Sequence, residues 1–198
     1  MLGKEILDKQ KQTPYGAFNA FLEAYKRRDF EAADSLLCKD LGTAFFNPDI
    51  DPESLSETDK TVIYLITENL TADVLKADYT GDMPLLTVHI KNNDVYNLVL
   101  ETSNIIYGDT KLQELTESGG TEVANARLAE LIAQTLDYLQ NAKDLPVIDE
   151  LIDVSVHLAD GEYRVVMTPD LCSCLTGFYV DLLNDLNNIT NEHQNQNK

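Results

Sequence analysis

Two segments of alternating apolar and polar residues constrain the fold of this chain most strongly. Residues 72–91 and 148–168 each hold two alternating runs joined by a turn, Gly81-Asp82 in the first and Ala159-Asp160-Gly161 in the second. Two such runs with a short glycine-containing turn between them predict a β-hairpin. Because a two-stranded hairpin is at best marginally stable alone, we expect both hairpins to pair within one sheet.

The rest of the chain has the spacing of amphipathic helices. Apolar residues recur at helical intervals in residues 13–37, 56–70, 93–139 and 170–189. In the first of these segments, Arg28-Asp29 separates two short helices. Helices and hairpins are therefore segregated along the chain. This order predicts an α+β fold, with helices packed on one antiparallel, curved sheet of about four strands.

The domain organisation follows from the same pattern. A chain of 198 residues can form one domain or two small ones. Since helices separate the two hairpins, neither half closes a core alone. We predict an N-terminal extension at residues 1–12, a single domain at residues 13–189 and a polar tail at residues 190–198. The residues expected in the core are Phe18, Phe21, Leu22, Val88, Val154 and Leu182.

The charge balance is strongly acidic, with 34 acidic and 15 basic residues and a formal net charge of −19. Such a charge repels nucleic-acid backbones and anionic membrane surfaces. It leaves open a basic partner, a cation, or solubility alone. The sequence has no apolar run near the ~20 residues of a membrane-spanning helix. The first residues also lack the apolar core of a signal peptide, so we expect neither feature in this chain.

Two histidines are the obvious candidates for acid–base chemistry. His89 and His157 both occupy the polar phase of a predicted strand, and Asp153 shares a face with His157 and could orient it. The polar phase of a half-buried strand looks away from the core. We therefore expect the face that holds His89, Asp153, Ser155 and His157 to be solvated, and we assign no catalytic residue.

Metal ligation is weakly indicated at two places. A loop with acidic residues between positions 49 and 59 lacks the spacing and central glycine of a calcium-binding loop. Cys172 and Cys174 lack a second ligand pair, and residues two apart on a helix face different ways. No metal or cofactor is expected, Cys38 is expected on the apolar side of a helix, and the role of Cys172 and Cys174 stays open. The acidic residues of the loop are Asp49, Asp51, Glu53, Glu57 and Asp59.

Aromatic side chains gather near the N-terminus. They could belong to the core, which is the commoner role of aromatic residues at helical spacing. They could also line a ligand pocket between the helices and the sheet. These candidate pocket residues are Tyr15, Phe18, Tyr25, Phe45 and Phe46.

Three stretches together resemble the NTF2-like, cystatin-type α+β fold. They are AFNAFLEAYKRRDFEAADSLL, VHIKNNDVYNLV and VSVHLADGEYRVVMTPDL. The arrangement is most similar to surface lipoproteins of Gram-positive bacteria that have no assigned activity. The resemblance implies an extracytoplasmic location and a homodimer that pairs through the sheet face. The chain departs from that group because it has no lipid-bearing cysteine at its start and no Trp.

These observations support three classes of function. The first is a non-enzymatic module that binds a small apolar ligand or a protein partner. The second is an acidic protein that neutralises a basic partner, such as an immunity protein against a nuclease-type toxin, because opposite potentials steer association. The third is a small enzyme with an acid–base pair in its pocket.

Overall fold

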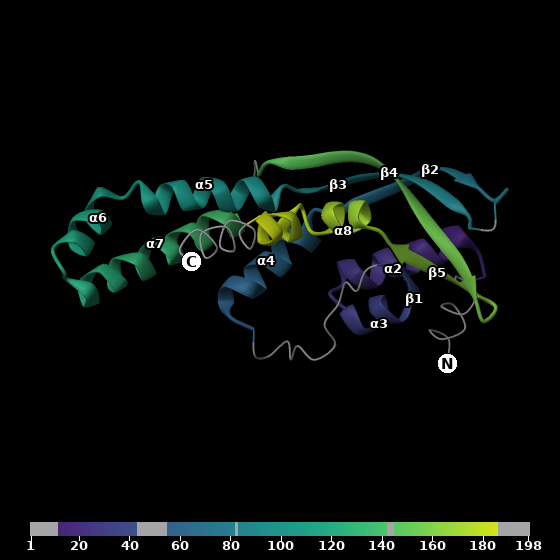
Figure 1. The fold of residues 1–198 in the computed structure, drawn as a ribbon, viewed down its shortest axis with the longest axis horizontal. Helices are drawn as coiled ribbons and strands as arrows, with labels where there is room; N and C mark the ends of the chain where they lie inside the picture. The colour runs from purple at the N-terminus through teal and green to yellow at the C-terminus, as the bar shows by residue number, and fades with distance from the viewer. Residues whose placement is uncertain (1–11, 43–54, 82, 142–144, 186–198) are drawn as a thin grey trace, which may run out of the picture.

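The computed structural model describes residues 12–42, 55–81, 83–141 and 145–185. It shows an α+β fold in which helices lie against a five-stranded sheet (Figure 1). The elements are α2 (Pro14–Lys26), α3 (Phe30–Ser35), β1 (Leu37–Gly42), α4 (Glu57–Glu68), β2 (Thr71–Asp78), β3 (Leu85–Asn93), α5 (Val95–Tyr107), α6 (Thr110–Glu117), α7 (Thr121–Asn141), β4 (Val147–Ala159), β5 (Glu162–Met167) and α8 (Pro169–Leu175). None of the helices described is long and apolar enough to span a membrane.

The two predicted hairpins pair in one sheet, as expected. The strand order is β1-β5-β4-β3-β2, and β3 joins the hairpins by pairing antiparallel with β4, where Leu86 lies opposite Val154. The second hairpin turns at Asp160 and Gly161, whose φ angles are 53° and 83°. Two consecutive residues with positive φ form the turn that best matches strand twist.

The sheet differs from the prediction in having a fifth strand. Leu37 and Cys38, expected on a helix, begin β1, which runs parallel to β5, so the sheet is mixed. Helix α3 ends at Ser35, and the Leu36 carbonyl accepts a hydrogen bond from the Val165 amide at 2.9 Å. This bond joins residues far apart in sequence. A short apolar run has no periodicity that separates a helix end from an edge strand.

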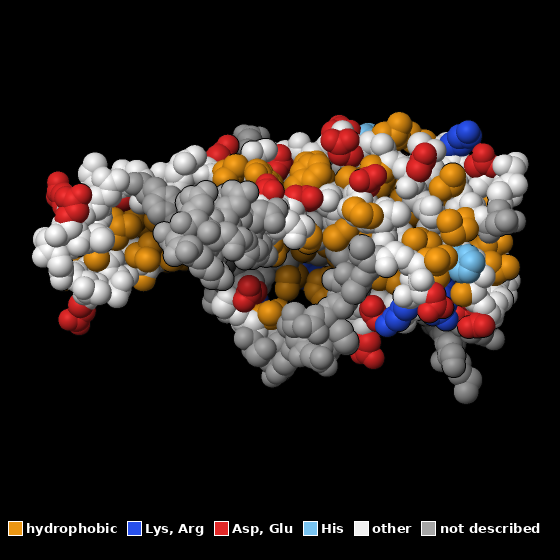
Figure 2. Space-filling view, viewed as in Figure 1, with side chains coloured by type: hydrophobic (Ala, Val, Ile, Leu, Met, Phe, Trp, Pro, Cys, Tyr) orange, Lys and Arg blue, Asp and Glu red, His pale blue; other side chains and the backbone are white. Residues whose placement is uncertain are grey.

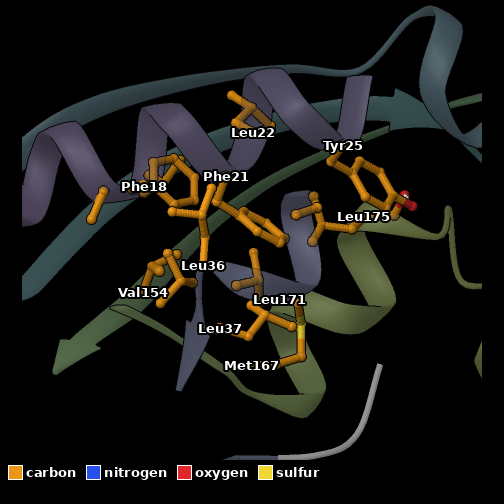
Figure 3. Packing of buried hydrophobic residues seen from close by; sticks show 14 of the residues in the cluster. Phe18, Phe21, Leu22, Tyr25, Leu36, Leu37, Val154, Met167, Leu171 and Leu175 are labelled. Atoms are coloured by element: carbon orange, nitrogen blue, oxygen red, sulfur yellow. Dashed lines mark hydrogen bonds between the residues drawn. The ribbon is translucent and has the colours of Figure 1, made fainter. Parts of the chain in front are cut away.

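The main core lies between the inner face of the sheet and helices α2 and α8. All six residues predicted in the core are buried. Figure 3 shows Phe18, Phe21 and Leu36 pointing into one shared space, close to Val154. The Tyr25 hydroxyl donates a hydrogen bond to the Leu175 carbonyl at 3.1 Å, which satisfies the one polar atom of this buried ring.

The last predicted helix is interrupted. Helix α8 ends at Leu175, Gly177 and Phe178 have φ angles of 57° and 59°, and residues 179–185 are again helical. The Gly177 carbonyl accepts a hydrogen bond from the Tyr96 amide at 3.1 Å. A Cβ at position 177 would lie 2.1 Å from the Asn93 carbonyl oxygen. This close approach to the start of α5 requires glycine and the left-handed conformation.

Asn92 joins β3 to the surrounding helices. Its buried side-chain amide donates to the carbonyls of Ile66, Cys174 and Leu175 at 3.1, 3.2 and 2.9 Å. Its side-chain oxygen accepts a hydrogen bond from the Asn93 amide at 2.9 Å. A buried strand end and two helix ends thus depend on one side chain.

We expect Asn92→Ala to lower the free energy of unfolding by about 2–4 kcal/mol, because buried polar groups would lose their partners. Urea denaturation measures the effect. Asn104→Ala is the control, since Asn104 is exposed on α5 and its loss should change stability by no more than about 0.5 kcal/mol. Equal midpoints for the two variants would contradict the importance of these bonds.

Candidate binding groove in the helical arm

Three of the aromatic residues predicted to line a pocket are described by the structure, and they do not lie on one shared surface. Phe18 and Tyr25 belong to the packed core, with exposed fractions of 0% and 1%. Tyr15 lies on the surface of the same helix and is 49% exposed. Phe45 and Phe46 lie outside the described residues. The aromatic stripe of α2 is therefore core rather than the floor of a cavity.

A small depression lies near the start of α2. It has a volume of about 420 Å³ and is lined by residues of two hairpins and of the segment that enters α2. Tyr79 and Tyr163 supply its aromatic surface, and Pro14 and Leu158 its apolar surface. Tyr15 is adjacent in sequence but does not line it.

The outer face of the sheet carries exposed and half-exposed polar side chains, as the strand phase predicts, together with exposed aliphatic ones. His89 pairs with Asp149, which also contacts the Lys91 ammonium at 2.8 Å. These hydrogen bonds, from Lys91 first and then His89, lower the pKa of the Asp149 carboxyl. Asp153 accepts a hydrogen bond from the Thr87 hydroxyl at 2.8 Å.

The strand phase suggested that Asp153 could orient His157. In the structure, Asp153 instead bonds to Thr87. His157 lies opposite Arg164 of β5, and its Nδ1 atom has no hydrogen-bond partner among the described residues. A general base in an acid–base pair needs its partner within hydrogen-bond reach. The structure shows no such pairing of His157 with Asp153.

The cysteines occupy apolar surroundings. Cys174 is buried and Cys172 half-buried in α8, while Cys38 is buried in β1 rather than in a helix. Burial raises the pKa of both Cys172 and Cys174 to about 11. Both thiols are therefore protonated at neutral pH, which is the unreactive form.

The acidic loop falls mostly outside the described residues. Asp49, Asp51 and Glu53 are not among them, and Glu57 begins α4. The Asp59 carboxylate accepts hydrogen bonds from the Ser56 amide and hydroxyl, which completes a capping box. Across the described part of the chain, no three His, Cys, Asp or Glu side chains are grouped so that they could hold a metal ion.

A second concave surface lies on an arm formed by α5, α6 and α7. These helices extend away from the sheet (Figure 1), and the base of the arm packs against α4. Between the three helices lies an open groove of about 610 Å³. Its lining residues are Ser103, Ile106, Leu112, Gln113, Thr116, Glu117, Ala124, Asn125 and Leu128.

One polar contact sets the geometry of the arm. Asp109 is the N-cap of α6, and its carboxylate accepts a hydrogen bond from the Leu112 amide at 2.7 Å. The same carboxylate accepts one from the Arg127 guanidinium of α7 at 2.7 Å. Arg127 also contacts Glu130 at 2.7 Å. The cap of α6 is thus tied to α7, and this tie holds the two walls of the groove together.

The arm has apolar residues on more than one face. On α7, Ala124 and Leu131 are buried, yet Val123 and Ile132 are also apolar and are exposed. A helix with apolar residues outside its core stripe indicates a further contact surface. This signal was present in the sequence. Other exposed apolar residues of the arm are Leu100, Ile105 and Tyr138.

The arm is also acidic. Residues 95–141 carry seven acidic residues and two basic ones, and Arg127 is already paired with Asp109 and Glu130. Lys111 is the other basic residue in this range. On the arm, Figure 2 shows hydrophobic side chains in a recess, with acidic side chains at its margins. The groove therefore combines an apolar floor with a negative surround.

The tie between Asp109 and Arg127 predicts a pH dependence. The hydrogen bond from Arg127, and then that from the Leu112 amide, lower the pKa of Asp109 in the folded state. A carboxyl whose pKa is lowered by folding stabilises the protein above its unfolded-state pKa, and this contribution is lost as the pH falls through the folded-state value. NMR titration of the Asp109 carboxyl should show a midpoint below the usual aspartate range. Arg127→Met should move the midpoint back toward that range, and an unchanged midpoint would contradict the tie.

Comparison of this chain with protein-family models, with curated proteins and with solved structures finds no significant match.

Proposed function

We propose that this protein is a non-enzymatic binding module that holds a basic protein partner through the arm of α5, α6 and α7. The observation that carries the proposal is the groove, which is open, has an apolar floor and lies on an acidic projection. Opposite potentials steer two proteins together, and buried apolar contacts at the centre of the interface hold them. The proposal therefore combines two of the classes of function that the sequence supports, the non-enzymatic binding module and the neutraliser of a basic partner.

Asn125 offers a way to block the groove without disturbing the core. It is exposed, lines the groove and lies on α7. Asn125→Trp fills the groove, whereas Asn104→Trp puts the same bulk on an exposed position of α5 that does not line it. The two variants have the same charge and differ only in place.

The test begins with affinity capture from cells, using the parent and both variants. A captured protein is then purified, and its Kd for each is measured by calorimetry. We expect a partner of net positive charge that Asn125→Trp binds at least about 10-fold more weakly than the parent and Asn104→Trp do. A partner that binds all three equally would place the site elsewhere and overturn the proposal.

A small apolar ligand is the second occupant to consider, because the groove volume falls within the range of ligand sites. Nile red reports on such binding through its fluorescence. If the dye binds the parent and not Asn125→Trp, and no protein partner depends on Asn125, the small-ligand function is favoured.

The remaining expectations belong to the same proposal. The NTF2-like assignment is supported by helices that cover one face of a sheet, and the extracytoplasmic location by the resemblance alone.

The outer sheet face is proposed as a homodimer surface, supported by exposed aliphatic side chains on three adjacent strands. The exposed aliphatic side chains are Leu75, Leu85, Val147 and Leu151. Analytical ultracentrifugation should show that the parent is a dimer and that Leu151→Glu is a monomer.

A further inference from the structure

We infer that the groove of the arm receives an amphipathic helix with a cationic flank, presented by the basic partner. This inference rests on the proposed function, and it names the structural element that the arm recognises. Three properties of the groove carry it: its helical walls, its non-aromatic floor and its acidic rim.

The walls of the groove exclude pairing with a strand. They are formed by α5, α6 and α7, whose backbone groups are bonded within each helix. An extended guest would find no unpaired sheet edge here, so its own backbone donors and acceptors would lie unsatisfied on an apolar floor. A helix satisfies its backbone groups internally and can be buried on one face without this penalty.

The floor favours aliphatic anchors. Ile106, Leu112, Ala124 and Leu128 form it, and none of the described side chains that line the groove is aromatic. Recognition of proline-rich segments uses grooves lined by aromatic rings, so that mode does not fit. Three helices that meet around an open apolar groove can pack a fourth helix by the ordinary rules of helix bundles. Such a guest would present apolar residues at i, i+3, i+4 and i+7.

The acidic residue at the edge of the groove favours a bound helix that carries positive charge. Glu117 lines the groove, while Glu114 lies on the same helix outside it. Lys and Arg can lay their apolar stems along the floor and place their charged ends at an acidic rim. Arg127, the basic residue of α7, pairs with Asp109 and Glu130 and forms no described ion pair with Glu117. A cationic flank is therefore complementary to this site.

A synthetic peptide tests the inference directly. The probe is about 14 residues long, or roughly four helical turns, with Leu at helical spacing and Lys elsewhere. One control peptide has the same composition with its Leu residues spread over all faces, and another replaces Lys with Glu. Fluorescence anisotropy gives Kd, circular dichroism reports helix formation on binding, and NMR shifts locate the peptide.

We expect only the amphipathic Leu/Lys peptide to bind, to become helical, and to shift the amides of residues 103–128. Asn125→Trp should weaken it at least about 10-fold, and Asn104→Trp should not. Glu117→Lys should weaken it at least about threefold more than Glu114→Lys, because of the two only Glu117 lines the groove, where it can contact the cationic flank of the guest directly. All four residues are exposed, so the variants should keep the parent's urea midpoint, which is checked for each.

Two results would overturn the inference. One is equal binding of the scrambled Leu/Lys peptide, and the other is an equal effect of Glu117→Lys and Glu114→Lys, since both would indicate adsorption to the acidic surface at large. These failures differ from failure of the proposed function. A native partner that depends on Asn125 while the amphipathic peptide does not bind would keep the function and reject the helix. A native partner indifferent to Asn125→Trp would reject the function itself.

Discussion

Gly177→Ala is expected to lower the free energy of unfolding by about 2–5 kcal/mol. A residue other than glycine pays about 1–2 kcal/mol for the left-handed conformation, and position 177 has a φ of 57°. The new Cβ would also lie 2.1 Å from the Asn93 carbonyl oxygen and 3.1 Å from Val95 Cγ2, so the backbone must shift. Overpacking of this kind adds about 1–3 kcal/mol.

Gly161→Ala is the matched control. Gly161 also has a positive φ, 83°, but no atom lies within 4 Å of the position its Cβ would take. It should therefore show the conformational penalty alone, about 1–2 kcal/mol. Urea denaturation of both variants separates the two contributions. If both variants lose the same free energy of unfolding, the close approach of residue 177 to Asn93 does not contribute to the destabilisation.

Phe21→Ala is expected to lower the free energy of unfolding by about 3–5 kcal/mol, because a fully buried ring is removed and a cavity remains. Phe21 points from α2 into the main core (Figure 3), and its ring stacks on Tyr25 with centroids 6.1 Å apart. The loss should appear as a lower urea midpoint with an unchanged slope.

Tyr15→Ala is the control on the same helix. Tyr15 is 49% exposed, so its replacement should change stability by less than about 1 kcal/mol. Agreement of the Phe21→Ala midpoint with that of the parent, within error, would mean that the buried face of α2 is assigned wrongly.

The candidate site was less predictable than the core. The acidic charge and the helical nature of residues 109–118 could be read from the sequence, but the groove could not. Its geometry depends on Arg127 reaching Asp109, a contact across 18 positions that no periodicity indicates. Of the aromatic residues proposed for a pocket, Phe18 and Tyr25 are instead packed in the core, because large rings at the apolar phase of a helix contribute most when they are buried.

The sequence by itself determined the local features of this protein. Thr13, Asp29 and Ser56 cap their helices through contacts within three residues, and Asp160-Gly161 turns the second hairpin through its own backbone preferences. The apolar phase of the predicted strands and helices likewise placed the six predicted core residues. These features depend on neighbours along the chain, where spacing and residue type carry the whole signal.

Only the tertiary structure decided the rest. The Leu37–Gly42 segment became a strand because the edge of β5 offered hydrogen-bond partners, and the last predicted helix broke at Gly177 because the start of α5 lies against it. The groove lies where α5, α6 and α7 meet. Each of these outcomes depends on residues distant in sequence, and a non-local contact can override a weak local preference.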